Sequence, residues 1–249
     1  MSYLDRQKIK RLLHIRDKMK GHYNKIVSYF IEVINAFIML ITTAKIDIIP
    51  VNKKERTQIM KFVHIADSHF DRPFVSLRGN KQLLKRRRLA QKYTFNKVID
   101  YIKENKIELL FISGDLFEHK YVEEDTINFL ISCFKEIPDT MIYITPGNHD
   151  PLVKSSPYNK YEFPNNVFIF GGEVGKYEYK NVNIYGIGFT DFEFSSDEIP
   201  NIEVDYSKIN ILITHGTLNG NSEKYFDIKE SWLNKFDYVA LRTYTSSKS

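Results

Sequence analysis

The sequence predicts an α/β fold in which mixed sheets are covered by helices. From Met60 onward, short apolar runs rich in β-branched or aromatic residues recur along the chain, as strands require. Two longer segments between the early runs show the helical spacing of apolar residues. Strands and helices alternate at first, and later strands follow one another directly. This order is typical of mixed sheets with a helical cover.

Seven segments are expected as strands, and each is short and apolar. In chain order they are Lys61–Ala66, Ile107–Ser113, Met141–Thr145, Val167–Phe170, Val182–Phe189, Ile209–Thr214 and Tyr238–Leu241. Two segments are expected as helices, Lys81–Asn105 and Val122–Lys135. In the first helix Val98, Ile99 and Ile102 share one face, and in the second Ile127, Leu130, Ile131 and Phe134 do so.

Residues 1–59 differ in kind from the rest and are expected to form a helical leader. Arg6–Lys25 is charged, and Ile26–Ala44 is a 19-residue stretch that is mostly apolar. That length could just cross a bilayer, but Glu32 near its middle argues against a membrane span. We therefore expect the apolar part to pack on itself or on a partner.

A second interpretation of the leader is that translation natively starts at Met60. This residue opens MKFVHIAD, a sound first strand, and Lys54–Arg56 can be encoded by purine-rich codons that resemble a ribosome-binding sequence. Residues 1–59 would then come from an upstream reading frame. A pyrimidine-rich choice at those codons in the gene would contradict this hypothesis.

Charge and cysteine content set the remaining limits. The formal net charge is +5, but residues 1–59 hold 12 basic and 5 acidic residues, whereas the remainder holds 24 and 26. The basic excess therefore lies in the leader, and it carries no argument for nucleic-acid binding by residues 60–249. The single cysteine, Cys133, excludes an internal disulfide and suits a reducing, cytoplasmic location.

The residues that carry chemistry follow four of the expected strands. They are Asp67 and His69, then Asp115 after a glycine, then Asn148, His149 and Asp150, and finally His215. Loops beyond the carboxyl ends of strands are where open α/β sheets place their ligands. Each group alone has an ordinary explanation as a cap, a turn or a structural histidine. All four together offer the oxygen and imidazole ligands that hold Mn²⁺, iron or Zn²⁺.

These blocks resemble the calcineurin-like metallophosphoesterases, whose motifs read D-x-H, G-D, G-N-H-[DE], H and G-H-x-H. Within that superfamily, MKFVHIADSHFDRPF, FISGDLFEHK and YITPGNHDP are similar to the bacterial SbcD-type DNA repair exonucleases. The resemblance implies an α-β-β-α sandwich with two mixed sheets over residues 60–249. It also implies a metal-dependent phosphoesterase, and most specifically a DNA exonuclease.

The same resemblance implies a role for each residue. Asp67 and His69 would bind a first metal, Asp115 would bridge two metals, and Asn148 and His215 would bind the second. His149 would act as general acid, with its imidazole oriented by Asp150. The cofactors would be two divalent ions, most simply Mn²⁺, which activate a hydroxide for attack on phosphorus. DNA ends, an SbcC-like ATPase with a long coiled coil and a second copy of the chain in a homodimer are the implied partners.

The chain departs from the family pattern after Leu241. There the family has Gly-His-x-His, whereas this sequence has Arg242 and Thr243 followed by Tyr-Thr. Synonymous codons for this tail can spell Gly-His-Ile-His in the adjacent frame. We therefore expect a domain that is incomplete at its C-terminus, lacks its last strands through a one-base insertion, and is weakly active or inactive. The nucleotide sequence around codon 242 tests this hypothesis.

Two other functions stay open at this point. One keeps the site but changes the substrate, giving a small-molecule phosphodiesterase or a protein phosphatase. The other is a non-catalytic remnant or binding module that retains the fold. Hydrolysis of bis(4-nitrophenyl) phosphate compared with duplex DNA ends separates the first from a nuclease, and the metal content of the purified protein tests the second.

Overall fold

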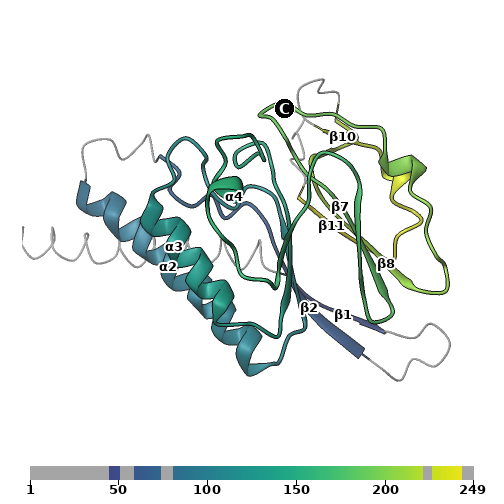
Figure 1. Ribbon diagram of the computed structural model, residues 1–249, viewed down its shortest axis with the longest axis horizontal. Coiled ribbons are helices and arrows are strands. Elements are labelled where there is room, and N and C mark those ends of the chain that lie inside the picture. The colour runs from purple at the N-terminus through teal and green to yellow at the C-terminus, as the bar shows by residue number, and fades with distance from the viewer. Residues whose placement is uncertain (1–44, 51–58, 74–80, 221–225, 243–249) are drawn as a thin grey trace, which may run out of the picture.

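In the computed structural model of the protein, residues 45–50, 59–73, 81–220 and 226–242 are described. Two main sheets lie face to face, and helices α2 and α3 cover the outer face of the first sheet (Figure 1). The arrangement is a mixed α/β fold, as the sequence predicts.

The first sheet has five strands, in the order β1-β2-β3-β4-β5. They are β1 (Lys45–Pro50), β2 (Ile59–Ile65), β3 (Leu109–Ser113), β4 (Met141–Thr145) and β5 (Val167–Ile169). Strands β2 to β5 are parallel, and β1 pairs with β2 antiparallel. The carboxyl ends of β2, β3 and β4 therefore lie side by side at one edge of the sheet.

The second sheet has four strands, in the order β11-β8-β7-β6. They are β6 (Gly175–Tyr179), β7 (Val182–Ile187), β8 (Ile209–His215) and β11 (Tyr238–Arg242). Only β6 runs antiparallel to its neighbour, so both sheets are mixed. A short parallel pair, β9 (Thr217–Leu218) with β10 (Asp227–Ile228), follows β8.

Three apolar clusters hold these layers together. The first, with Phe95 and Leu130, lies between the first sheet and helices α2 (Lys81–Glu104) and α3 (Glu124–Lys135). The second, with Phe62 and Ile211, lies between the two sheets. The third includes Leu212 on β8 and packs the second sheet against two 3₁₀ segments, Ile199–Asn201 and Glu230–Trp232, and the β9–β10 pair. The short helix α4 (Pro157–Lys160) packs on the first cluster through Tyr158.

The structure corrects parts of the sequence interpretation. Lys45–Pro50 belongs to the segment expected as a helical leader, but it forms the edge strand β1, as suits its run of isoleucines. Residues 1–44 lie outside the described part of the chain. Strand β6 was not expected, because GKYEY alternates exposed and half-buried side chains and contains few apolar residues. In the described ranges, 3₁₀ turns and the β9–β10 pair pack on the outer face of the second sheet.

Across the described ranges, every helix is either too short or too polar for a membrane span. The apolar segment Ile26–Ala44, for which a span was weighed, falls outside those ranges.

Candidate metal centre

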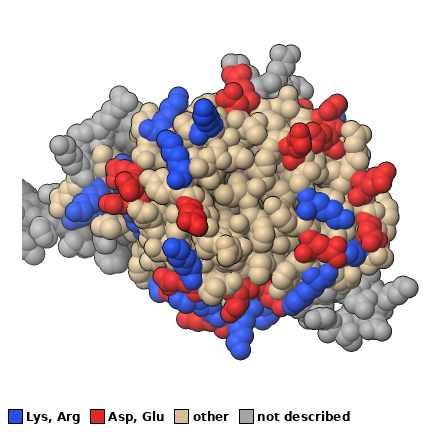
Figure 2. Space-filling view, viewed as in Figure 1, with Lys and Arg blue, Asp and Glu red and all other residues tan. Residues whose placement is uncertain are grey.

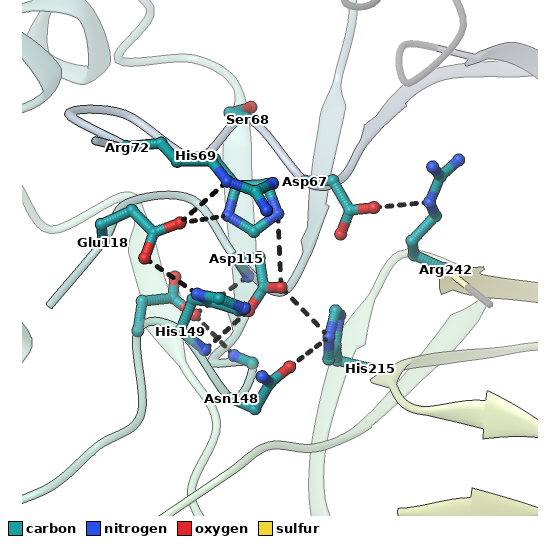
Figure 3. A network of polar contacts seen from close by, with 12 residues as sticks. Asp67, Ser68, His69, Arg72, Asp115, Glu118, Asn148, His149, His215 and Arg242 are labelled. Atoms are coloured by element: carbon teal, nitrogen blue, oxygen red, sulfur yellow. Dashed lines mark hydrogen bonds and ion pairs between the residues drawn. The ribbon is translucent and has the colours of Figure 1, made fainter. Parts of the chain in front are cut away.

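Polar side chains converge where strands of the two sheets end (Figure 3). Asp67 and His69 follow β2, Asp115 follows β3, and Asn148 and His149 follow β4. His215 is the last residue of β8, in the second sheet, so the two sheets contribute to one site. The structure therefore brings together residues that are up to 148 positions apart in the sequence.

The loops that carry these side chains have an unusual backbone. Asp67, His69 and Asp115 have φ values of 51°, 44° and 55°, in the left-handed region that non-glycine residues rarely adopt. Each such residue costs about 1–3 kcal/mol and persists only where the surroundings hold it. Here Asp67 N donates to Gly114 O at 3.2 Å, and His69 N donates to Asp115 O at 2.8 Å. The two loops fix each other in the conformation that presents the side chains.

Two glycines permit the close approach of these loops. Gly114 has a φ of 80°, and a Cβ added there would lie 2.3 Å from His215 Nδ1. A Cβ at Gly147 would lie 2.3 Å from Asp115 Oδ1. Any larger residue at either position would displace a side chain of the site.

Asp115 lies at the centre of the cluster. Its Oδ2 lies 3.6 Å from His69 Nε2 and 3.4 Å from His215 Nε2. Its Oδ1 accepts a hydrogen bond from His149 N at 2.9 Å, which fixes the carboxylate plane. Asp115 is buried, and its Oδ2 faces both His69 and His215.

The outer hydrogen bonds of the histidines decide which ring nitrogen faces the centre. His215 Nδ1 contacts the carbonyl oxygen of Ser113 at 3.1 Å, and a carbonyl can only accept. Nδ1 of His215 therefore carries a proton, and Nε2 turns an unprotonated lone pair toward Asp115 in the neutral ring. Asn148 Oδ1 lies 3.2 Å from the same Nε2. This outward Nδ1–H bond is the usual way in which a metal-binding histidine is oriented.

Glu118 makes the same kind of contact to the other two histidines, and the sequence analysis missed it. Its Oε1 lies 2.9 Å from His69 Nδ1, and its Oε2 lies 2.8 Å from His149 Nδ1. Burial would raise the pKa of Glu118, but the hydrogen bonds from His149 and His69 outweigh it and lower the pKa to about 2. The hydrogen bond to Glu118, against burial, raises the pKa of His149. The only available signal was a carboxylate three residues after Asp115, in the same loop.

Asp150 does not contact the His149 ring, contrary to expectation. Its buried carboxylate accepts hydrogen bonds from the backbone N–H groups of Asp115, Leu116 and Gly147 and from the Tyr158 hydroxyl, at 2.7–2.9 Å. Burial and the neighbouring Asp115 raise the pKa of Asp150 to about 6, while the hydrogen bonds from Gly147, Tyr158 and Leu116 oppose that rise. The described contacts make Asp150 a brace between two site loops, and Glu118 takes the position beside the imidazole.

One oxygen of the Asp67 carboxylate points toward Arg242 (Figure 3). Arg242 Nε lies 2.5 Å from Asp67 Oδ2. Within the described part of the chain, the other oxygen of Asp67, Oδ1, is buried and has no hydrogen-bond partner. Arg242 ends β11, in register with His215 on β8, and this pairing places it beside the site.

The residues present fit a pair of divalent ions. Two groups have ligand atoms within 4.8 Å of one another, namely His69, Asp115 and His149, and Asp67, Asp115 and His215. The groups share Asp115, as a bridging carboxylate requires, and their mixed oxygen and imidazole donors suit Mn²⁺, iron or Zn²⁺. Asp67 Oδ1, which is buried and has no hydrogen-bond partner among the described residues, also suits a cation. The grouping differs from the expected one, since Asp67 falls with His215 and His69 falls with His149.

Comparisons with known proteins agree with this geometry. The profile of the family described as calcineurin-like phosphoesterase matches residues 60–244. The chain is also similar to a protein named DNA double-strand break repair protein Mre11 from Methanopyrus kandleri, with 27% identity over 93 residues. That region covers 36% of this chain and 19% of the relative, so the likeness spans about a fifth of the length of that protein.

Proposed function

Because the chain belongs to the calcineurin-like phosphoesterase family, we propose that it is a metal-dependent hydrolase of phosphodiester bonds and that its substrate is DNA. The observation that carries the proposal is the shared position of Asp115 between two groups of ligand atoms. One carboxylate within reach of two cations is the arrangement that two-metal hydrolases use.

The chemistry divides between the cofactor and the protein. Bound divalent ions, proposed to be Mn²⁺, would supply hydroxide at neutral pH and neutralise charge on the phosphoryl oxygens. Asp67, His69, Asn148 and His215 would hold them, with Asp115 between them. The geometry of these residues is set by the outward hydrogen bonds and the loop conformations described above.

His149 is proposed as the general acid. Its side chain is 37% exposed, so it can reach a substrate, and Glu118 holds its Nδ1–H. The raised pKa keeps more of the imidazolium form near neutral pH. That form would donate the Nε2 proton to the departing sugar oxygen, leaving a neutral ring that Glu118 still orients.

The choice of DNA rests on similarity rather than on charge. The three motif segments resemble SbcD-type exonucleases, and the Methanopyrus relative is named as a double-strand break repair protein. On the face shown in Figure 2, by contrast, basic and acidic side chains are intermixed around a broad area that has neither. No continuous basic tract is visible there among the described residues. DNA ends and a coiled-coil ATPase of the SbcC type are proposed as partners on the same grounds.

The test compares two substrates and two variants. Purified protein with Mn²⁺ is assayed on blunt duplex DNA and on bis(4-nitrophenyl) phosphate, with metal content measured in parallel. Because the sequence departs from the family pattern after Leu241, we expect only weak, Mn²⁺-dependent degradation of DNA. Asp115→Asn should abolish this hydrolysis, whereas Asp139→Asn, at an exposed turn, should leave it unchanged.

The outcomes separate the remaining functions. Hydrolysis of the small ester without DNA would replace the nuclease by a small-molecule phosphodiesterase. Absence of both activities, together with absence of bound metal, would leave a non-catalytic member of the family.

A further inference from the structure

We infer that Arg242 competes with a metal ion for the Asp67 carboxylate, so that the protein loads its two metal positions unequally. The inference rests on the proposed metal centre and adds to it a residue that controls occupancy. Arg242 is not among the residues that the family resemblance assigns to the site. Its role follows from one contact, the 2.5 Å approach of its Nε to Asp67 Oδ2.

The first step is that this contact is held by charge. Asp67 is buried, with 5% of its side chain exposed, whereas 42% of the Arg242 side chain is exposed. Among the described residues, neither Asp67 Oδ1 nor Arg242 Nε has a hydrogen-bond partner. A buried carboxylate needs a positive partner, because desolvation penalises the unpaired anion. Here the Arg242 guanidinium is that partner.

The second step is that a metal ion and the guanidinium share one carboxylate. Asp67 Oδ2 contacts Arg242, and an oxygen of Asp67 lies within 4.8 Å of ligand atoms of Asp115 and His215. A cation bound there therefore meets a carboxylate whose charge Arg242 already offsets, and binding through both Asp67 oxygens requires the ion pair to break. The register of β11 with β8 keeps Arg242 beside His215, so the competitor stays close after it has been displaced.

The third step is that, among the described residues, no arginine or lysine pairs directly with His69, Asp115 or His149. His69 and His149 are held by Glu118, and Arg72 pairs with Glu118, with its Nε 3.8 Å from Oε1. Arg72 thus contacts the carboxylate that orients the two histidines. We conclude that a first Mn²⁺ binds at the side of His69 and Asp115 and that the Asp67 side fills only at higher concentration.

The two arginines provide a matched experiment. Their side chains have similar exposure, 42% for Arg242 and 44% for Arg72, and each makes an ion pair with one acidic residue of the site. Metal-free full-length protein is titrated with Mn²⁺ alone, and the number of sites and their dissociation constants are measured by calorimetry and by electron paramagnetic resonance of free Mn²⁺. Arg242→Gln and Arg242→Met remove the competitor, and Met keeps the apolar stem of the side chain.

We expect two unequal sites in the wild-type protein. Either Arg242 variant should tighten the weaker site about tenfold, somewhat more than an exposed ion pair contributes, because Asp67 is buried. The tighter site should change by less than about twofold, and Arg72→Gln should leave the weaker site within about twofold of wild type, as expected for a change of distant charge alone. Circular dichroism checks that each variant is folded.

Asp67→Asn distinguishes failure of this inference from failure of the metal centre. If Asp67→Asn removes the weaker site while both Arg242 variants leave its affinity unchanged, the competition does not exist and the metal centre stands. If Arg72→Gln tightens the weaker site as much as Arg242→Gln does, general electrostatics replace direct competition, and the inference fails. If Asp67→Asn changes neither site, the proposed centre fails together with the inference.

Discussion

Nδ1 of His149 lies 2.8 Å from Oε2 of Glu118, and the other oxygen of the same carboxylate lies 2.9 Å from His69 Nδ1. One buried side chain thus orients two imidazoles from different loops. Several consequences of this and of neighbouring contacts can be measured.

The first prediction concerns activity after Glu118→Gln. The substitution keeps the shape of the side chain but removes its negative charge, so the pKa of His149 falls. If His149 donates its proton to the leaving group, the alkaline limb of the pH–rate profile should therefore move to lower pH. We also expect a loss of about 10–100-fold in activity or metal affinity, as for other residues that orient metal ligands. The measurement is kcat against pH with saturating Mn²⁺.

The control for this prediction is Glu123→Gln, which removes an exposed carboxylate that pairs with Arg88. It should leave both the rate and the profile unchanged. An unshifted alkaline limb in Glu118→Gln would show that His149 does not donate the proton in the step that limits the rate.

The second prediction concerns stability against pH in the metal-free protein. Glu118 has an ordinary pKa of 4.5 that folding lowers to about 2, so its contribution is present above about pH 4.5 and is lost as the pH falls toward 2. The pKa of His149 is raised above its ordinary 6.5, so its contribution is present below about pH 6.5 and is lost as the pH rises through the folded value. The pair therefore stabilises the fold most between about pH 4.5 and 6.5.

Urea unfolding checks this window. The difference in unfolding free energy between wild type and Glu118→Gln should be larger at pH 5.5 than at pH 9 or pH 2.5. An equal difference at all three values would mean that the contact contributes no charge-dependent stability.

The third prediction concerns Asp150 as a brace between loops. Asp150→Ala leaves four donors without their acceptor, and it should cost about 3 kcal/mol or more of unfolding free energy. Tyr158→Phe removes one of these donors and should cost about 1–2 kcal/mol. Asp139→Ala, at an exposed turn, should stay within about 0.5 kcal/mol of wild type. A small effect of Asp150→Ala would contradict the bracing role.

The sequence predicted those parts of the fold that depend on local pattern. Met141–Thr145 forms a strand with the expected bounds, because five adjacent apolar or β-branched residues leave little alternative. The strand at Gly175–Tyr179 was not predictable in this way, since it is stabilised by pairing with β7 rather than by its own apolar residues. The edge strand Lys45–Pro50 likewise depends on β2 for its pairing.

The site shows the same division. Asp67, His69, Asp115, Asn148 and His215 were predicted to converge because each follows or ends a strand, and the structure places them together. Parallel pairing explains this for the residues after β2, β3 and β4, whereas His215 comes from the second sheet. The partners of these residues were not predictable. Glu118 gave only the weak signal of a carboxylate three residues after Asp115, and Arg242 reaches the site through strand pairing with no spacing signal. The sequence adjacency of His149 and Asp150 does not fix the direction of either side chain. Adjacent residues point different ways, which is why the orienting role was assigned to the wrong carboxylate.

The fourth prediction concerns Gly114. An added methyl group would lie 2.3 Å from His215 Nδ1, and the φ of 80° is unfavourable for alanine. Gly114→Ala should therefore displace His215, weaken Mn²⁺ binding at least about tenfold and lower stability by about 1–3 kcal/mol. Gly171→Ala is the matched control, because its added methyl group would meet nothing within 4 Å. Equal metal affinity in the two variants would show that His215 is not a ligand.

The fifth prediction concerns Cys133, which is buried on α3 with its thiol 3.3 Å from Asn96 Oδ1. Burial raises the pKa of this thiol from 9.0 to about 12. Because the thiolate is the reactive form, this rise in pKa lowers the thiolate fraction at neutral pH about a thousandfold. Burial also restricts the access of a reagent to the sulfur. Ellman's reagent should react at least about a hundredfold more slowly with the native protein than with the protein in urea.

The comparison variant carries Ser132→Cys in a Cys133→Ser background. The new thiol lies one residue away, on the exposed side of the helix, and should react rapidly in the native state. Equal rates for the two thiols would mean that α3 does not pack against the first sheet as described.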